Sequence, residues 1–187
     1  MTERSASGRS YLDPAGLLQR SGLSAGMRVG DFGVGGAAYF GVQASKMVGD
    51  RGTIFAVDVF KPALSSALSK ARLEGCTNFK PVWSDLEVVG GTRAIPNNSL
   101  DFGVLVNVLH QSKQQKNVLQ ECARMLKPGA RLLIVDWSKG GEIFGPKREA
   151  VVPVERVLDL CTQAGLAPFD QFEAGPYHYG LVVVKAG

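Results

Sequence analysis

The stretch Met27-Arg-Val-Gly-Asp-Phe-Gly-Val-Gly-Gly-Ala-Ala-Tyr-Phe40 decides the fold of this chain. An apolar, strand-like run ends at Asp31, a glycine-rich turn follows from Gly33 to Gly36, and an amphipathic run begins at Tyr39. Glycine lacks Cβ, so its backbone can bend tightly and approach a ligand closely. Strand, glycine turn and helix in this order are typical of α/β proteins that hold a nucleotide-like ligand at the carboxyl edge of a parallel sheet.

The remaining sequence alternates strand-like and helix-like segments. Strands are expected at 29–32, 53–58, 79–83, 100–106 and 131–135, and helices at 14–20, 39–48, 62–75, 112–127 and 154–164. Ser112 is expected to cap one helix, and Pro128-Gly129 to break it before the fifth strand. Two last strands, at about 168–174 and 179–185, flank Gly175-Pro176 and indicate a hairpin. The pattern predicts the α/β class, with a single doubly wound, mostly parallel sheet and a C-terminal antiparallel hairpin.

Composition indicates an ordinary globular domain. The chain has 187 residues, of which 45% are hydrophobic and 20% charged. This length favours one domain over residues 11–187, preceded by a flexible N-terminus at residues 1–10. The formal net charge of +4 is spread along the chain, with one modest group at Lys139, Lys147 and Arg148. Such a balance permits an anionic partner without requiring one.

The cysteines and the apolar runs bear on metal sites and compartment. Cys76, Cys122 and Cys161 are far apart in sequence and show no metal-ligand spacing. Their number and spacing fit a reducing, cytoplasmic compartment. No run is long enough to span a membrane, and the first residues lack the apolar core of a signal peptide.

Three acidic residues follow or end expected strands at one sheet edge. Asp58 ends the second strand, where an acid in nucleotide-binding sheets accepts hydrogen bonds from both ribose hydroxyls. The alternative is that Asp58 caps the helix that follows. Asp85 follows the third strand, where its carboxylate either accepts a hydrogen bond from an exocyclic amine of the ligand or is simply solvated. Asp31 either orients the glycine turn through its N–H groups or lies near a positive group of the ligand.

Histidine and aromatic residues gather at the later strand ends. His110 follows the fourth strand and is either a general base or a hydrogen-bonded wall residue, because imidazole can take a proton near neutral pH. Asp136-Trp137 ends the fifth strand and is expected to line the far side of the pocket. Tyr177-His-Tyr179 lies in the closing hairpin, where aromatic residues either pack or form a substrate wall.

Taken in order, these segments resemble the class I S-adenosylmethionine-dependent methyltransferases, most of all the small ubiquinone-biosynthesis-like, or type 11, members. The resemblance covers about residues 12–187. It rests on Val29-Gly-Asp-Phe-Gly-Val-Gly35, Ala56-Val-Asp58, Ser84-Asp-Leu86, Leu100-Asp-Phe-Gly-Val-Leu-Val-Asn-Val-Leu-His110 and Met125-Leu-Lys-Pro-Gly-Ala-Arg-Leu-Leu-Ile-Val-Asp136, with the final hairpin matching the reversed last strand of that fold.

The resemblance implies a Rossmann-like fold, S-adenosylmethionine as cofactor and S-adenosylhomocysteine as product. The methyl acceptor is unidentified, and a small molecule is favoured over protein or RNA. No metal is implied, and His110 is the candidate catalytic residue. The cofactor-binding residues implied are Asp31, Gly33, Gly35, Gly36, Asp58, Val59, Ser84, Asp85, Leu86 and Asn107.

One departure from the family pattern keeps other functions open. The family usually has Gly-x-Gly-x-Gly, whereas here Ala37 and Ala38 follow Gly36. The same residues also read as Gly-x-Gly-x-x-Ala, which suggests an NAD-dependent oxidoreductase. A cofactor-binding pseudo-enzyme or scaffold is the non-enzymatic alternative. The loop 138–152 is expected to be mobile and to contact the acceptor.

Overall fold

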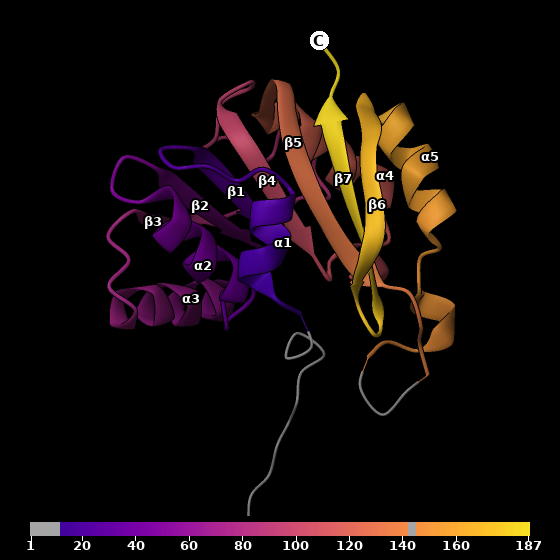
Figure 1. The fold of residues 1–187 in the computed structure, drawn as a ribbon, viewed down its shortest axis with the longest axis horizontal. Helices are drawn as coiled ribbons and strands as arrows, with labels where there is room; N and C mark the ends of the chain where they lie inside the picture. The colour runs from indigo at the N-terminus through magenta and orange to yellow at the C-terminus, as the bar shows by residue number, and fades with distance from the viewer. Residues whose placement is uncertain (1–11, 142–144) are drawn as a thin grey trace, which may run out of the picture.

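Strand β1 (Arg28–Phe32) lies inside a seven-stranded sheet, with the order β3-β2-β1-β4-β5-β7-β6 (Figure 1). The computed structural model describes residues 12–141 and 145–187. Strands β1 to β5 pair in parallel, and β7 is antiparallel to both of its neighbours. The other strands are β2 (Thr53–Asp58), β3 (Phe79–Trp83), β4 (Leu100–Val106), β5 (Leu126–Trp137), β6 (Leu166–Gly175) and β7 (His178–Lys185). The predicted fold class and the terminal hairpin are confirmed.

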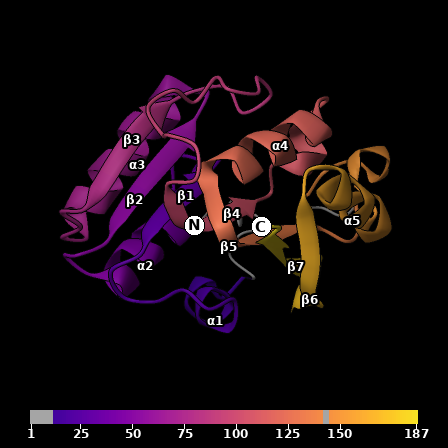
Figure 2. The ribbon, with the colours of Figure 1, turned by 90° about the horizontal axis from the view of Figure 1, so that it is seen from above.

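Helices cover both faces of the sheet (Figures 1 and 2). One core holds buried side chains of α1 (Pro14–Arg20), α2 (Tyr39–Val48) and α3 (Lys61–Leu73). The other holds those of α4 (Gln115–Met125) and α5 (Val154–Gln163). Because both faces are covered, the middle of β2 is a continuous buried run, from Ile54 to Val57. There are two short 3₁₀ turns: η2 (Leu109–Gln111) follows β4, and η3 (Arg148–Ala150) precedes α5.

The strand order places a ligand site between β1 and β4. The chain runs outward from β1 to β2 and β3, and then returns to β4 on the other side of β1. The connections on either side of this reversal leave on opposite faces of the sheet, which opens a crevice at the carboxyl ends of the strands. The glycine turn, Asp58, the loop after β3 and the turn after β4 all lie at this edge.

Two expected boundaries are wrong. Helix α4 begins at Gln115, and Ser112 does not cap it: the Ser112 hydroxyl donates to Glu87 (2.7 Å) and accepts from the Gln114 amide. Strand β5 begins at Leu126, not Arg131, because Leu100 already pairs with Leu126. A register shift between Leu100 and Phe102 accommodates the Pro128-Gly129 turn that was expected to separate helix from strand.

Some expectations stand without a test. The flexible N-terminus predicted for residues 1–10 lies outside the described residues, and the single domain over 11–187 stays a prediction.

Helix α1 forms where expected: the Asp13 carboxylate accepts from the Gly16 amide (3.1 Å), and Pro14 occupies the first turn. Among the described residues, no helix is both long and apolar enough to cross a membrane.

Candidate active site

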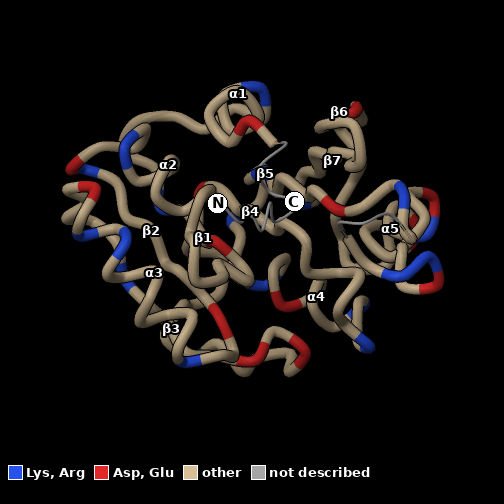
Figure 3. The backbone as a smooth tube through the Cα atoms, turned by 90° about the horizontal axis from the view of Figure 1, so that it is seen from below, with Lys and Arg blue, Asp and Glu red and all other residues tan. Residues whose placement is uncertain are grey.

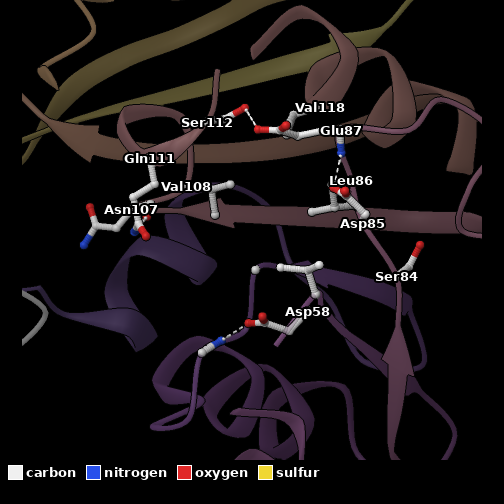
Figure 4. A pocket seen from close by; sticks show the side chains of 13 residues that line it. Asp58, Ser84, Asp85, Leu86, Glu87, Asn107, Val108, Gln111, Ser112 and Val118 are labelled. Atoms are coloured by element: carbon white, nitrogen blue, oxygen red, sulfur yellow. Dashed lines mark hydrogen bonds between the residues drawn. The ribbon is translucent and has the colours of Figure 1, made fainter. Parts of the chain in front are cut away.

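A cavity of about 440 Å³ lies at the carboxyl ends of β1 to β4 (Figure 4). All the predicted cofactor residues except Asp31 and Gly36 line it. The lining residues are Gly33, Gly35, Asp58, Val59, Ser84, Asp85, Leu86, Glu87, Asn107, Val108, Gln111, Ser112 and Val118. Segments far apart in sequence therefore meet in one crevice, as the topology predicts.

Asp58 braces the glycine turn. Its Oδ2 accepts a hydrogen bond from the Gly35 amide (2.9 Å), and its Oδ1 accepts one from the Phe60 amide (2.9 Å). Phe60 precedes the first residue of α3, and its own side chain makes no cap. Asp58 thus holds the turn against the start of α3 while its carboxylate lines the cavity. A carboxylate oxygen has more than one lone pair, so both oxygens can still accept from a ligand.

The glycine turn needs residues without side chains. Gly33 has a φ of 75° and Gly35 a φ of 61°, in the left-handed region that glycine tolerates best. A Cβ on Gly33 would also collide with the side chain of Val108, which lines the same cavity. Ala38 has a φ of 47° and directly precedes α2, without a side-chain cap. Ala38 therefore occupies a conformation that glycine adopts more easily, and this leaves local backbone strain.

Asp31 and Gly36 lie beside the cavity rather than in its lining. Asp31 is buried, and a Cβ added at Gly41 in α2 would fall 2.5 Å from its Oδ2. This places the Asp31 carboxylate against the first turn of α2. Gly36 packs near Ser66 of α3, whose Cβ would lie 3.4 Å from a Cβ on Gly36.

The loop after β3 is tied down by hydrogen bonds of its own. Asp85 lines the cavity, and its Oδ1 accepts from the Glu87 amide (2.8 Å), while no described residue hydrogen-bonds to its Oδ2. Glu87 Oε1 accepts from the Ser112 hydroxyl (2.7 Å) and the Lys113 amide (3.1 Å). The loop after β3 is thereby joined to the segment after β4 across the cavity mouth (Figure 4).

A buried ion pair in α4 holds the far end of this loop. Glu121 is fully buried and accepts from the amides of Gly90 (2.6 Å) and Thr92 (2.9 Å) and from Arg124. Burial opposes its charged form, but these hydrogen bonds outweigh burial and lower the pKa of Glu121 to about 2. Sequence reasoning missed this residue. The signal available was an acid on the apolar stripe of an amphipathic helix, three residues before an arginine.

Asn107 is strained and carries an unpaired amide oxygen. It follows β4 with a φ of 57°, and its backbone accepts from Gln111 Nε2 (2.7 Å) and donates to Val135 (2.8 Å). Its Oδ1 is buried, no described residue hydrogen-bonds to it, and Asn107 lines the cavity. Strained backbone and an orphaned polar atom concentrate at ligand sites, because the ligand compensates for both.

His110 lies in η2, next to the cavity but not among its lining residues. Its Nδ1 is 2.7 Å from Asp136 Oδ1, and its amide donates to Asp136 Oδ2 (3.2 Å). Trp137 stands edge-on to the imidazole, with ring centroids 6.5 Å apart. Asp136 and Trp137 were expected to line the pocket, but neither is among its lining residues, and the contact of Asp136 with His110 was not predicted.

The closing hairpin adds further unpaired polar groups beside Asp136. His178 pairs with Trp137 and Tyr179 with Asp136 across β5 and β7. Both side chains are buried, and within residues 12–141 and 145–187 neither the His178 ring nitrogens nor the Tyr179 hydroxyl has a hydrogen-bond partner. Burial lowers the pKa of His178 to about 4 and raises that of Tyr179. The hairpin thus places buried polar groups beside Asp136, while none of its residues is among those that line the cavity, and the choice between packing and a substrate wall stays a prediction.

The expected loop 138–152 is only partly described. Residues 142–144 lie outside the described residues, so the expected mobility and acceptor contact of the whole loop stay predictions. A Cβ added at Gly145 would lie 2.9 Å from the Trp137 ring, so the loop backbone packs on that ring. In residues 12–141 and 145–187, no group of three or more candidate metal ligands comes together.

Comparisons with known proteins identify the family. Residues 30–134 match the methyltransferase domain family, and this match covers more than half of the chain. The chain belongs to the methyltransferase domain family. It is 30% identical over 96% of its length to a SAM-dependent methyltransferase from Aquifex aeolicus, of which 93% is covered, with a TM-score of 0.85.

Among curated proteins, the chain is 30% identical over 120 residues to the ubiquinone/menaquinone biosynthesis C-methyltransferase UbiE of Erwinia tasmaniensis. That alignment takes in 64% of this chain and 46% of the relative, so the chain spans about half the length of the curated relatives it matches. The [4+2]-cyclase SpnF has the same fold, with 16% identity, a TM-score of 0.76, and coverage of 92% of this chain and 79% of SpnF. That likeness concerns the fold alone.

The family determines the cofactor of this methyltransferase-domain protein. S-adenosylmethionine is the methyl donor of these enzymes, so the cofactor predicted from the resemblance is confirmed at the level of the family. The matches also disfavour the NAD-dependent oxidoreductase, whose glycine fingerprint overlaps the same turn. Assignment of individual residues to parts of the cofactor remains a matter of proposal.

Proposed function

We propose that this chain transfers the methyl group of S-adenosylmethionine to a small organic acceptor. The observation that carries the proposal is the cavity at the switch point, where a glycine turn and Asp58, Asp85 and Asn107 converge. A sulfonium methyl is already electrophilic, which is the chemistry the cofactor supplies when bound. The work left to the protein is to hold the acceptor in line and to exclude water.

The residues of the cavity fit the three parts of this cofactor. Asp58 suits the ribose hydroxyls, since its carboxylate has lone pairs beyond the two that it uses on amides. Asp85 suits the exocyclic amine of adenine, and the unpaired Oδ1 of Asn107 suits the ammonium of the methionine part. Gly33 and Gly35 let the backbone approach the ligand without a side chain between them.

A small neutral acceptor is favoured over RNA. Lys and Arg positions are distributed around the described fold rather than gathered into one patch, as the view from the strand ends shows (Figure 3). RNA binding at useful affinity depends on concentrated positive charge. The curated relative, by its name, acts in ubiquinone and menaquinone biosynthesis, which involves small molecules.

The cysteines support a reducing, cytoplasmic setting for this reaction. All three thiols are free, and Cys122 and Cys161 are buried. Burial raises the pKa of Cys161 to about 12, which keeps that thiol protonated and unreactive. Free, inert thiols are ordinary in reducing compartments.

The cofactor assignment is tested by calorimetry with S-adenosylhomocysteine on Gly33→Val. Its matched control is Gly75→Val, since Gly75 also has a φ of 75° but faces open space after α3. Both variants suffer backbone strain, and only the first places a side chain in the cavity. Binding lost in Gly33→Val and kept in Gly75→Val supports the proposal, whereas equal affinities reject it.

The acceptor class is tested by charge reversal in the loop before α5. Lys147→Glu with Arg148→Glu removes the local positive group that an anionic acceptor would use. With a single-stranded RNA oligonucleotide as probe, we expect neither wild type nor variant to show salt-dependent binding. A wild-type affinity that falls steeply with salt and is lost in the variant would instead favour RNA.

A further inference from the structure

The carboxylate of Asp136 is directed entirely at its neighbours around His110. Oδ1 lies 2.7 Å from His110 Nδ1 and accepts from the Trp137 amide at 2.8 Å. Oδ2 accepts from the His110 amide at 3.2 Å. Asp136 is 2% exposed, so solvent does not compete for these bonds. One carboxylate therefore hydrogen-bonds to both the ring and the backbone amide of the same histidine.

This contact determines which ring nitrogen carries the proton. An ionised carboxylate only accepts hydrogen bonds, so Nδ1 of the neutral imidazole must be the donor. Nε2 then bears the lone pair, and no described residue hydrogen-bonds to it. The His110 side chain is 11% exposed, so only a small part of the ring reaches open space. The arrangement produces a fixed imidazole with one unused basic nitrogen.

The position of this imidazole suits the acceptor rather than the cofactor. Asn107, Val108 and Gln111 flank His110 in sequence and line the cavity. The His110 ring itself contacts Asp136 and Trp137 at the end of β5. Asp58 and Asp85, the residues assigned to ribose and adenine, follow β2 and β3 on the other side of β1. His110 thus lies at the boundary between the cavity and the β5–β7 side.

We propose that Asp136 is a positioning residue that holds His110 as the general base for an acceptor bearing a hydroxyl group. This inference rests on the proposed function. The hydroxyl proton passes to His110 Nε2, and an oxygen electron pair forms the bond to the methyl carbon. The carbon–sulfur bond breaks, and its electron pair stays on sulfur, which becomes neutral. Asp136 stabilises the imidazolium until its proton leaves to water.

Among methyl acceptors, a hydroxyl group is the one that needs a general base held in place by a carboxylate. A neutral amine already presents a lone pair and can lose its proton after transfer, so it gains little from a base. A hydroxyl oxygen is a poor nucleophile until its proton is removed or shared, which is the usual task of an oriented histidine. A carboxylate behind the histidine both selects the tautomer and stabilises the charge that forms.

The tautomer is measured directly by long-range proton–nitrogen NMR on the ¹⁵N-labelled full chain. The chain has two histidines, so His110→Gln assigns the signals. In its neutral form, the wild-type His110 ring should carry its proton on Nδ1. Asp136→Ala should lose this preference, and Asp136→Asn should keep it, because the amide oxygen still accepts. An Nε2-protonated wild-type ring, or an unaltered tautomer in Asp136→Ala, overturns the inference.

Phenol serves as the probe for a hydroxyl acceptor, with toluene as its matched control. In the presence of S-adenosylhomocysteine, phenol should shift the His110 Nε2 resonance saturably and toluene should not. Asp136→Ala should reduce the phenol effect at least tenfold in apparent affinity. Equal responses to phenol and toluene, or none to phenol, contradict the inference.

The same samples separate the two proposals. Failure of S-adenosylhomocysteine to bind wild type would contradict the proposed function itself. Normal binding of S-adenosylhomocysteine together with the wrong tautomer, or with no phenol response at His110, would contradict only the role of Asp136 and His110. Unchanged S-adenosylhomocysteine affinity in Asp136→Ala would also show that the variant remains folded.

Discussion

The Gly35 amide donates to Asp58 Oδ2 at 2.9 Å, so the acid at the end of β2 and the turn after β1 form one unit. The residue assigned to the ribose therefore also shapes the turn that carries the cavity. A substitution at Asp58 acts on the ligand directly and through the backbone of Gly35. Of the two interpretations of Asp58 in the sequence, the helix cap is wrong, since Phe60 is the N-cap residue of α3 and Asp58 accepts from its amide. The ribose role stays a proposal.

Asp58→Ala should weaken S-adenosylhomocysteine binding about 5- to 150-fold, or roughly 1–3 kcal/mol, because ligand hydroxyls and the Gly35 amide lose their acceptor. Calorimetry measures this, and thermal unfolding should show that the fold persists. Asp50→Ala is the control, since Asp50 is an exposed acid in the turn between α2 and β2. If Asp58→Ala and Asp50→Ala bind alike, the ribose assignment is wrong.

Ala38→Gly should stabilise the protein by roughly 0.5–1 kcal/mol, because glycine adopts a φ of 47° without the cost that alanine incurs. Urea unfolding measures the difference. Ala37→Gly provides the comparison: Ala37 is not among the residues with positive φ, so glycine there should be neutral or destabilising. Should the strain also limit cofactor affinity, Ala38→Gly alone would bind S-adenosylhomocysteine more tightly. Equal unfolding free energies for the two variants would contradict the strain at Ala38.

Glu121→Gln should destabilise the protein by roughly 3 kcal/mol, because it leaves Arg124 beside a neutral partner in a buried network. The pKa of Glu121 is lowered from 4.5 to about 2. Its contribution is therefore complete above pH 4.5 and is lost as the pH falls toward 2. Urea unfolding across this range should show a weaker acid dependence in the variant. Glu74→Gln, an exposed acid that also pairs with lysines, should leave the unfolding midpoint at neutral pH nearly unchanged.

His178→Phe should remove part of the acid sensitivity of folding. Burial lowers the pKa of His178 from 6.5 to about 4; nearby Asp136 opposes this, and His110 adds to it. Between these values His178 is protonated in the unfolded chain and neutral in the folded chain, so the free energy of unfolding falls as the pH drops from 6.5 to 4. The slope attributable to this group is about 1.4 kcal/mol per pH unit. Identical pH profiles for wild type and variant would refute a neutral buried imidazole.

The fold could be predicted because its signals are local and repeated. Buried strands such as Thr53–Asp58 and helices such as Tyr39–Val48 have the expected limits, since glycine and turn residues bound them on both sides. Ser112 was misassigned because its hydroxyl is occupied by Glu87, a partner 25 residues away in sequence. Such a long-range side-chain contact competes with helix capping and leaves no local trace.

The cavity was predictable to the extent that it depends on strand ends. Parallel strands bring their carboxyl ends to one edge, so Asp58, Asp85 and Asn107 could be grouped without knowing any distance. The contact between His110 and Asp136 could not be derived in the same way. It requires the 3₁₀ turn after β4 to direct an imidazole at the neighbouring strand, a matter of side-chain direction that residue spacing does not encode.

The most direct test of the central claim is calorimetric titration of the full wild-type chain with S-adenosylhomocysteine and, separately, with NAD⁺. The account predicts saturable binding of one S-adenosylhomocysteine per chain and much weaker or no binding of NAD⁺. The two ligands share an adenosine, so the comparison isolates the part of the cavity near Asn107 and the glycine turn. Tighter binding of NAD⁺ than of S-adenosylhomocysteine would contradict the account.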